Sequence, residues 1–288
     1  MDSAPAQSPT GAAHPAQAGA TPQFDIPPQG HFAKVNGIDL YYETYGQGEP
    51  LLLIHGFQGS GAVWGPVIPD FAKKYKVIVV DMRGHGRSSM NPPNATTFSH
   101  KQSALDMFAL LDHLGIQKIK AMGISSGGMT LLHMATQQPS RMEAMVLIGA
   151  TIYFGEPARQ IMRRETVESM SEKDWEFARR IHKRGDDQIR ALRTQFHNFK
   201  DSYQDMNFTP PLLGTITAST LIVHGDRDVF FPPEIPVTMY CSVPKSYLWI
   251  IPNGSHVPIV QHADEFNRIA GEFLSGAWEK SSKPWMCQ

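Results

Sequence analysis

Two short apolar runs do most to limit the folds open to this chain. The first is PLLLIHG at 50–56, and the second is KVIVVDMRG at 76–84. Runs this continuous are typical of strands buried on both faces, which occur in parallel sheets covered by helices. The sequence therefore predicts an α/β domain, and 288 residues suffice for one large domain with an inserted segment.

Strand-like and helix-like segments alternate through the first half of the chain. Two short strands are expected around the hairpin turn signal Asn36-Gly37. A crossover helix interrupted by prolines is expected at 61–75, and a regular helix at 99–115. Strands at 116–125 and 142–150 should flank a helix at 126–139. Such alternation predicts a mostly parallel sheet with right-handed crossovers.

The composition changes after Ala150. From about Tyr153 to Thr215 there is no strand-like run, and charged residues recur at helical spacing. We predict two to four inserted helices whose charges form solvated faces. A basic substrate-binding surface is the alternative, which the interleaved acids disfavour. Strands should resume at 219–225 and 246–252, before a final helix at about 263–274.

The predicted organisation has three parts. Residues 1–28 are rich in Ala and Pro, lack the pattern of a signal peptide and predict a disordered tail. Residues 29–152 and 216–288 form the core, and 153–215 form a helical cap. No run is apolar enough to span a bilayer. We expect a soluble protein, either cytoplasmic or, if a signal has been removed, periplasmic or secreted.

Charge and cysteine content limit the partners. The chain carries 26 Lys and Arg against 27 Asp and Glu, which favours neither nucleic acid nor an anionic membrane as a partner. Cys241 and Cys287 have no metal-ligand spacing. Free thiols are the preferred interpretation, and a disulfide in an oxidising compartment is the alternative.

One serine stands out in the stretch MGISSGGMT at 122–130. It lies where a strand turns sharply into a helix, a turn that lifts a side chain above the sheet and requires small residues two before and two after. Ser125 has Gly123 and Gly127 at those positions. Ser126 has Ile124 on one side, so Ser125 is the candidate nucleophile.

A serine needs a base, and the base needs an acid to orient it. Asp226 and Asp228 follow the strand in LIVHGDRDVFFPP, and His256 lies in PNGSHVP after the last strand. We choose Asp228, which lies deeper in its loop, and expect Asp226 to shape the turn. His256, flanked by turn residues, is the candidate base rather than a buried structural histidine.

The loop HGFQGS after the first apolar run completes the candidate site. The Phe57 and Ser126 amides are the expected oxyanion donors. His55 is more often structural in such a loop than a second base. DMRGHGRSS at 81–89 lacks the pattern of a phosphate-binding loop, so we expect it to brace the site.

Five motifs occur in order, namely HGFQGS, DMRGHGRSS, GISSGG, HGDRDVFFP and GSHVP. Together they resemble the α/β-hydrolase superfamily over about Phe32 to Leu274, and within it the capped single-chain serine hydrolases. The resemblance implies Ser125 as nucleophile, Asp228 as acid and His256 as base. Haloalkane dehalogenases and epoxide hydrolases are similar but carry aspartate at the position of Ser125.

The resemblance implies hydrolysis of a small to medium carboxylic ester or lactone, with no metal and no organic cofactor, by a monomer or homodimer. A perhydrolase, an acyltransferase or a C–C bond hydrolase would use the same three residues. A ligand receptor that kept the fold is a more distant alternative. Tyr153, Phe154 and Trp175 are candidates to line the substrate pocket, although each also suits packing of a cap helix on the core.

Overall fold

The computed structural model describes residues 29–278 and residue 287, so the predicted tail lies outside it. The described residues form an eight-stranded sheet in the order β1-β2-β4-β3-β5-β6-β7-β8. β2 pairs antiparallel with β1 and β4, and the other pairs are parallel. The strands are β1 Gln29–Val35, β2 Ile38–Tyr45, β3 Glu49–Ile54, β4 Tyr75–Val80, β5 Ile119–Ile124, β6 Met142–Ile148, β7 Ser219–Gly225 and β8 Ser246–Ile251.

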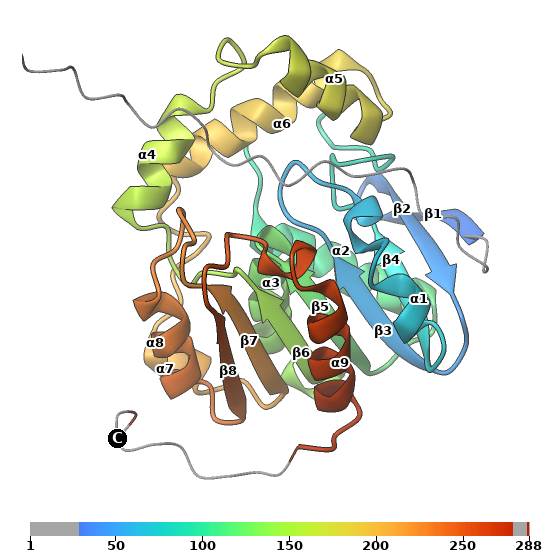
Figure 1. Cartoon of the computed structure of the whole chain (residues 1–288). Helices are drawn as coiled ribbons and strands as arrows, with labels where there is room; N and C mark the ends of the chain where they lie inside the picture. The colour runs from blue at the N-terminus through green and yellow to red at the C-terminus, as the bar shows by residue number, and fades with distance from the viewer. Residues whose placement is uncertain (1–28, 279–286, 288) are drawn as a thin grey trace, which may run out of the picture.

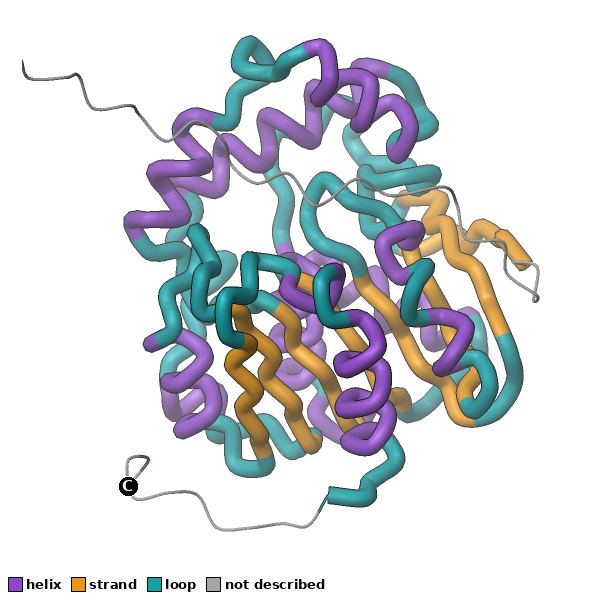
Figure 2. Tube along the Cα trace, viewed as in Figure 1, coloured by secondary structure: helices purple, strands orange, loops and turns teal. Residues whose placement is uncertain are grey.

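Helices cover both faces of the sheet (Figures 1 and 2). α1 and α9 lie on one face, and α2, α3 and α8 on the other. The helices of this part are η1 Gly61–Trp64, α1 Ile68–Phe71, α2 His100–His113, α3 Ser126–Gln137, η2 Pro139–Arg141, α8 Glu234–Ser242, η4 Pro258–Val260 and α9 Ala263–Leu274.

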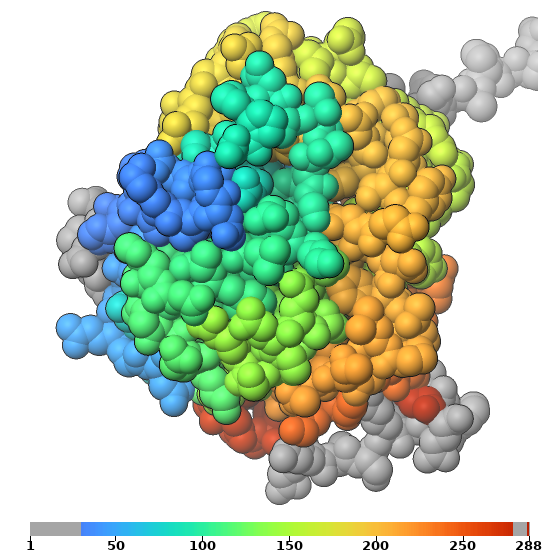
Figure 3. All heavy atoms as spheres, turned by 180° about the vertical axis from the view of Figure 1, so that it is seen from behind, coloured from blue at the N-terminus to red at the C-terminus, as the bar shows by residue number. Residues whose placement is uncertain are grey.

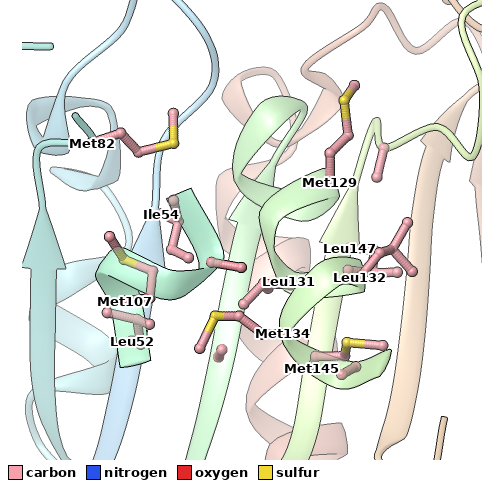
Figure 4. Close-up of a cluster of buried hydrophobic side chains, with 14 of the residues drawn as sticks. Leu52, Ile54, Met82, Met107, Met129, Leu131, Leu132, Met134, Met145 and Leu147 are labelled. Atoms are coloured by element: carbon pink, nitrogen blue, oxygen red, sulfur yellow. The ribbon is translucent and has the colours of Figure 1, made fainter. Parts of the chain in front are cut away.

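The two helical layers explain the continuous apolar run in β3. Side chains alternate along a strand, so Leu52 and Ile54 face α2 and α3, while Leu51 and Leu53 face α1 and α9. All four are fully buried. Figure 4 shows Leu52 and Ile54 among leucine and methionine side chains of α2, α3 and β6.

Most elements fall where they were predicted, with two differences. Asn36 and Gly37 take φ of 45° and 78° between β1 and β2, as the hairpin requires. The crossover at 61–75 holds two short helices instead of one, because Pro66 has no N–H to continue a helix. α8 was missed, and Pro236 lies within its first turn, where a proline is tolerated.

The segment between β6 and β7, residues 149–218, is called the insertion below. It contains α4 Glu156–Arg164, α5 Glu172–Ile181, α6 Asp186–Asn198, η3 Phe199–Asp201 and α7 Pro210–Leu213. α4, α5 and α6 lie across the top of the molecule in Figure 1, and from behind the insertion also continues along one side (Figure 3). Many of its charges form exposed ion pairs, such as Arg179 with Asp186. Arg159 and Arg193 are buried exceptions.

The preferred interpretation of the cysteines is wrong, because Cys241 and Cys287 form a disulfide. Their Cα atoms are 4.8 Å apart, within the usual range for a bridge. The two residues are 46 positions apart in the chain, and only the fold brings them together.

None of the helices between residues 29 and 278 is long and apolar enough to cross a bilayer.

Candidate active site

Ser125 lies in a sharp turn between β5 and α3. Its φ of 50° and ψ of −115° are a strained conformation for a residue other than glycine. A Cβ on Gly123 would lie 2.5 Å from the carbonyl carbon of Gly127, and one on Gly127 would collide with the Ile54 carbonyl. The two glycines are therefore required by close backbone approach, as the sequence predicted.

The structure brings Ser125, His256 and Asp228 together in one hydrogen-bonded row. Ser125 Oγ lies 3.0 Å from His256 Nε2, and His256 Nδ1 lies 2.7 Å from Asp228 Oδ2. A carboxylate only accepts hydrogen bonds, so Nδ1 carries the proton and the neutral ring presents its Nε2 lone pair to the serine. Such an arrangement can take the proton from the Ser125 hydroxyl.

Asp228 is held firmly at the end of this row. Its side chain is fully buried, and Oδ1 accepts hydrogen bonds from the Phe230 and Phe231 amides at 2.8 and 3.2 Å. The expectation that Asp226 shapes the turn through backbone hydrogen bonds is wrong. Among the described residues its Oδ1 has no partner, and its Oδ2 lies 3.8 Å from Arg227 Nε. Asp228 makes those backbone contacts itself, since its carboxylate points back over its own loop.

Two backbone amides border Ser125. Ser126 begins α3, and the loop with Phe57 passes close by, since a Cβ on Gly56 would lie 3.4 Å from the Ser125 Cβ. Within the described part of the chain, neither the Phe57 nor the Ser126 amide donates to a protein acceptor. Both N–H groups are therefore available to an anionic oxygen.

The flanking loops have the structural roles expected of them. His55 is buried, its Nε2 accepts from the Met82 amide at 2.9 Å, and its Nδ1 donates to the Gly56 carbonyl at 2.7 Å. The Asp81 carboxylate accepts from the Gly61 and Arg87 amides. Burial raises the pKa of that carboxyl. These contacts connect HGFQGS with the loop at 81–89.

The predicted pocket residues lie in different surroundings. Phe154 is buried, with its ring 5.3 Å from that of Phe199. Tyr153 is 44% exposed and pairs with Asn207. The half-buried Trp175 packs against arginine side chains of α5 and α6. Of the three, only Phe154 belongs to the aromatic cluster near Ser125.

That cluster, called the phenylalanine cluster below, was predicted only through Phe57 and Phe154, and the sequence did not indicate that the other rings join them. The Phe57 ring lies 5.9 Å from that of Phe196, which lies 6.4 Å from Phe230, whose ring is 4.7 Å from His256. The members are Phe57, Phe98, Phe154, Phe196, Phe199 and Phe230. Phe57 and Phe154 were singled out individually, and Phe230 lies two residues after Asp228, but Phe98, Phe196 and Phe199 carried no positional signal.

Among the described residues, no Lys or Arg side chain lies over a ring of this cluster, whereas the His85, His100 and His256 rings contact it. The cation–ring contacts among the described residues involve other rings, such as Tyr203 beneath Arg159. The Arg159 guanidinium instead donates to backbone carbonyls of 154, 199, 200 and 202. Between residues 29 and 278, no three His, Cys, Asp or Glu side chains gather as metal ligands.

Comparison with known proteins identifies the family of the chain. A model of the α/β-hydrolase fold matches residues 49–181. Serine hydrolase BPHL of Homo sapiens is 30% identical over 276 residues, which cover 91% of each chain. The 2-hydroxy-6-oxo-6-(2'-aminophenyl)hexa-2,4-dienoic acid hydrolase of Metapseudomonas resinovorans is 25% identical over 264 residues, covering 85% of this chain and 90% of that protein.

A solved structure shows the same fold. The enol-lactonase from Burkholderia xenovorans LB400 superposes with a TM-score of 0.70 at 21% identity, covering 85% of this chain and 99% of that one. The fold, the chain-long similarity to a serine hydrolase and the arrangement around Ser125 agree. The chain belongs to the α/β-hydrolase family and is a hydrolase of the serine type.

Proposed function

We propose that this protein hydrolyses carboxylic esters of small to medium apolar acids. The observation that carries the proposal is the row from Ser125 through His256 to Asp228, at 3.0 and 2.7 Å, with the serine on a strained turn. A serine held in this way attacks a carbonyl carbon while the histidine takes its proton.

The reaction has two steps. Ser125 Oγ bonds to the ester carbonyl carbon, the π electrons move onto the carbonyl oxygen, and His256 Nε2 receives the hydroxyl proton. Collapse of this intermediate expels the alcohol, which takes the proton from His256. Water then attacks the acyl-enzyme by the same route and releases the acid.

The anionic oxygen needs donors that are already in place. The Phe57 and Ser126 amides are the proposed pair, because both border Ser125 and neither has a protein acceptor among the described residues. Loss of one such donor typically costs about 10²–10³ in kcat. The buried Asp228 keeps His256 in the required tautomer and stabilises its charged form.

The phenylalanine cluster supports an apolar acyl group. Its rings run from Phe57 through Phe196 and Phe230 to His256, and no Lys or Arg of the described residues lies over them. The Metapseudomonas resinovorans relative acts on a dienoic acid, whose carboxylate needs a cation or several N–H donors. An uncharged ester therefore fits this cluster better than a dienoate.

The insertion is proposed to act as a cap over the site. It contributes Phe154, Phe196 and Phe199 to the cluster, and the amide of Lys183 donates to the Gly86 carbonyl of the core at 2.9 Å. Residues of the core and of the insertion would then together set the preferred length of the acyl chain.

The test is release of p-nitrophenol from acyl esters, acetate to octanoate, by wild type and Ser125→Ala. Ser275→Ala, on the exposed end of α9, is the matched control. We expect Ser125→Ala to lose at least about 10³-fold in kcat, and Ser275→Ala to match wild type. Full activity in Ser125→Ala would refute the mechanism. A wild type inactive on every ester but active on a dienoic acid would favour C–C hydrolysis.

A further inference from the structure

A second Ser-His-Asp row lies beside the first. His100 Nε2 is 2.9 Å from Ser126 Oγ, and His100 Nδ1 is 2.5 Å from Asp205 Oδ2. His100 is fully buried and Ser126 is 3% exposed. The proposed mechanism uses the backbone of Ser126 but neither its hydroxyl nor the two other side chains.

This second row does not make Ser126 a nucleophile. Ser126 is the first residue of a regular helix, whereas Ser125 has the strained backbone that lifts its hydroxyl. The Ser126 side chain is buried, while Ser125 is partly exposed. The second row can therefore act on catalysis only through the backbone amide of Ser126.

Asp205 fixes the far end of the row. This residue of the insertion accepts from Ser99 Oγ at 2.9 Å and from the His100 amide at 3.0 Å, where α2 begins. Burial alone would raise the pKa of the Asp205 carboxyl, but the adjacent His100 ring and these hydrogen bonds hold it well below its usual range. Asp205 is therefore ionised and accepts the Nδ1 proton of His100.

His100 then determines where the Ser126 hydroxyl points. Its Nε2 lies 2.9 Å from Ser126 Oγ, and the hydrogen bond between them turns the Ser126 side chain toward α2. A serine in the first turn of a helix otherwise bonds to nearby backbone N–H groups. Freed from His100, the hydroxyl oxygen could reach the amides that should receive the substrate oxygen.

We propose that His100, held by Asp205, is a positioning residue for the oxyanion-binding amide of Ser126, an inference that rests on the proposed function. The hydrogen bond between His100 Nε2 and Ser126 Oγ fixes the first turn of α3 and keeps that hydroxyl away from the Phe57 and Ser126 amides. Asp205 belongs to the insertion. The position of the insertion on the core therefore affects the position of the oxyanion-binding amide of Ser126.

The variants are Ser126→Ala, His100→Phe and the double variant. Ser126→Ala retains the backbone amide and removes only the hydroxyl. His100→Phe retains a ring between Phe98 and Phe199. His133→Gln is the control, because His133 contacts the Asp205 carbonyl at 2.7 Å and has no hydrogen bond to Ser126 among the described residues.

Four quantities separate positioning from general damage: kcat and KM on p-nitrophenyl butyrate, and the inhibition constants of an alkyl trifluoromethyl ketone and of butyrate. The ketone adds to Ser125 and places an anionic oxygen against the amides, whereas butyrate, the acid product, measures ground-state binding. We expect kcat and ketone affinity to fall together by about tenfold, below the cost of losing a donor. KM and butyrate affinity should stay within about twofold, and the double variant should be no worse than either single variant.

Other results would overturn the inference. Wild-type kcat and ketone affinity in Ser126→Ala, with Ser125→Ala inactive, would refute the positioning role alone. Losses that multiply in the double variant would show that the two residues act independently. Should His100→Phe not fold, Ser126→Ala carries the test by itself. Full activity of Ser125→Ala would instead refute the proposed function, and the inference with it.

Discussion

Lowering the pH from 7 to 5 should weaken the fold through two buried histidines, His55 and His182. Burial lowers the pKa of each ring from 6.5 to about 4. His55 Nε2 accepts the Met82 amide at 2.9 Å, and His182 Nδ1 accepts the Gly86 amide at 3.0 Å. A second proton on either ring would occupy that lone pair and break the bond.

The sign follows from proton binding. Between pH 6.5 and 4 the unfolded chain binds more protons at these rings than the folded protein, so the free energy of unfolding falls as the pH falls. Each ring lowers the free energy of unfolding by about 2 kcal/mol at pH 5 and by about 3 kcal/mol at pH 4. Together they remove roughly 4 kcal/mol at pH 5, a large share of the 5–15 kcal/mol typical of a folded protein.

Other buried groups modify this slope. Burial also lowers the pKa values of His85, His133 and His224, which act in the same direction. Burial raises the pKa of Asp81, so the folded protein takes up that proton first. Asp81 therefore opposes the loss of stability at pH values above its ordinary pKa of 3.8.

The assay is urea unfolding at pH 7 and pH 5 for wild type, His182→Asn and His113→Gln. The asparagine Oδ1 can accept the Gly86 amide without taking up a proton, whereas His113 is exposed on α2. We expect the loss of stability between the two pH values to be about 2 kcal/mol smaller in His182→Asn than in wild type. His113→Gln should behave as wild type. An equal loss in His182→Asn and wild type would refute the assignment.

Three further changes have definite expected outcomes. Gly127→Ala would drive a methyl group into the Ile54 carbonyl, so we expect at least about 3 kcal/mol lower stability or no folded protein, measured by thermal unfolding. Reduction of the disulfide from Cys241 to Cys287, which spans 46 positions, should lower the free energy of unfolding by roughly 4 kcal/mol, and Cys287→Ser should abolish the effect of reductant. Phe196→Ala should shift the acyl-chain optimum of the esterase assay toward longer chains, whereas Phe177→Ala, packed beside Arg180, should leave it unchanged.

Features with a local cause were predictable from the sequence. The strands follow from apolar runs, and the turn at Ser125 follows from two glycines within two residues of it. Asp228 was chosen for its depth in the loop, and its carboxylate does reach His256.

Features that depend on contacts between distant segments were not predictable. Phe98 precedes α2, whereas Phe196 and Phe199 lie in α6 and in η3 directly after it, and each alone is an ordinary apolar residue. Cys241 and Cys287 meet only through the fold. His100 carried no motif, and its partner Asp205 lies 105 positions away.

The two adjacent serines show which information selects a nucleophile. Side-chain distances do not distinguish the two serines. The serine–histidine and histidine–aspartate distances are 2.9 and 2.5 Å at Ser126, and 3.0 and 2.7 Å at Ser125. The backbone conformation distinguishes them, because of the two serines only Ser125 has the positive φ that lifts a hydroxyl out of the helix. The glycine pattern in the sequence encodes that conformation directly. A search for Ser-His-Asp geometry alone would have found two candidates here, and the spacing of two glycines favours Ser125, the proposed nucleophile.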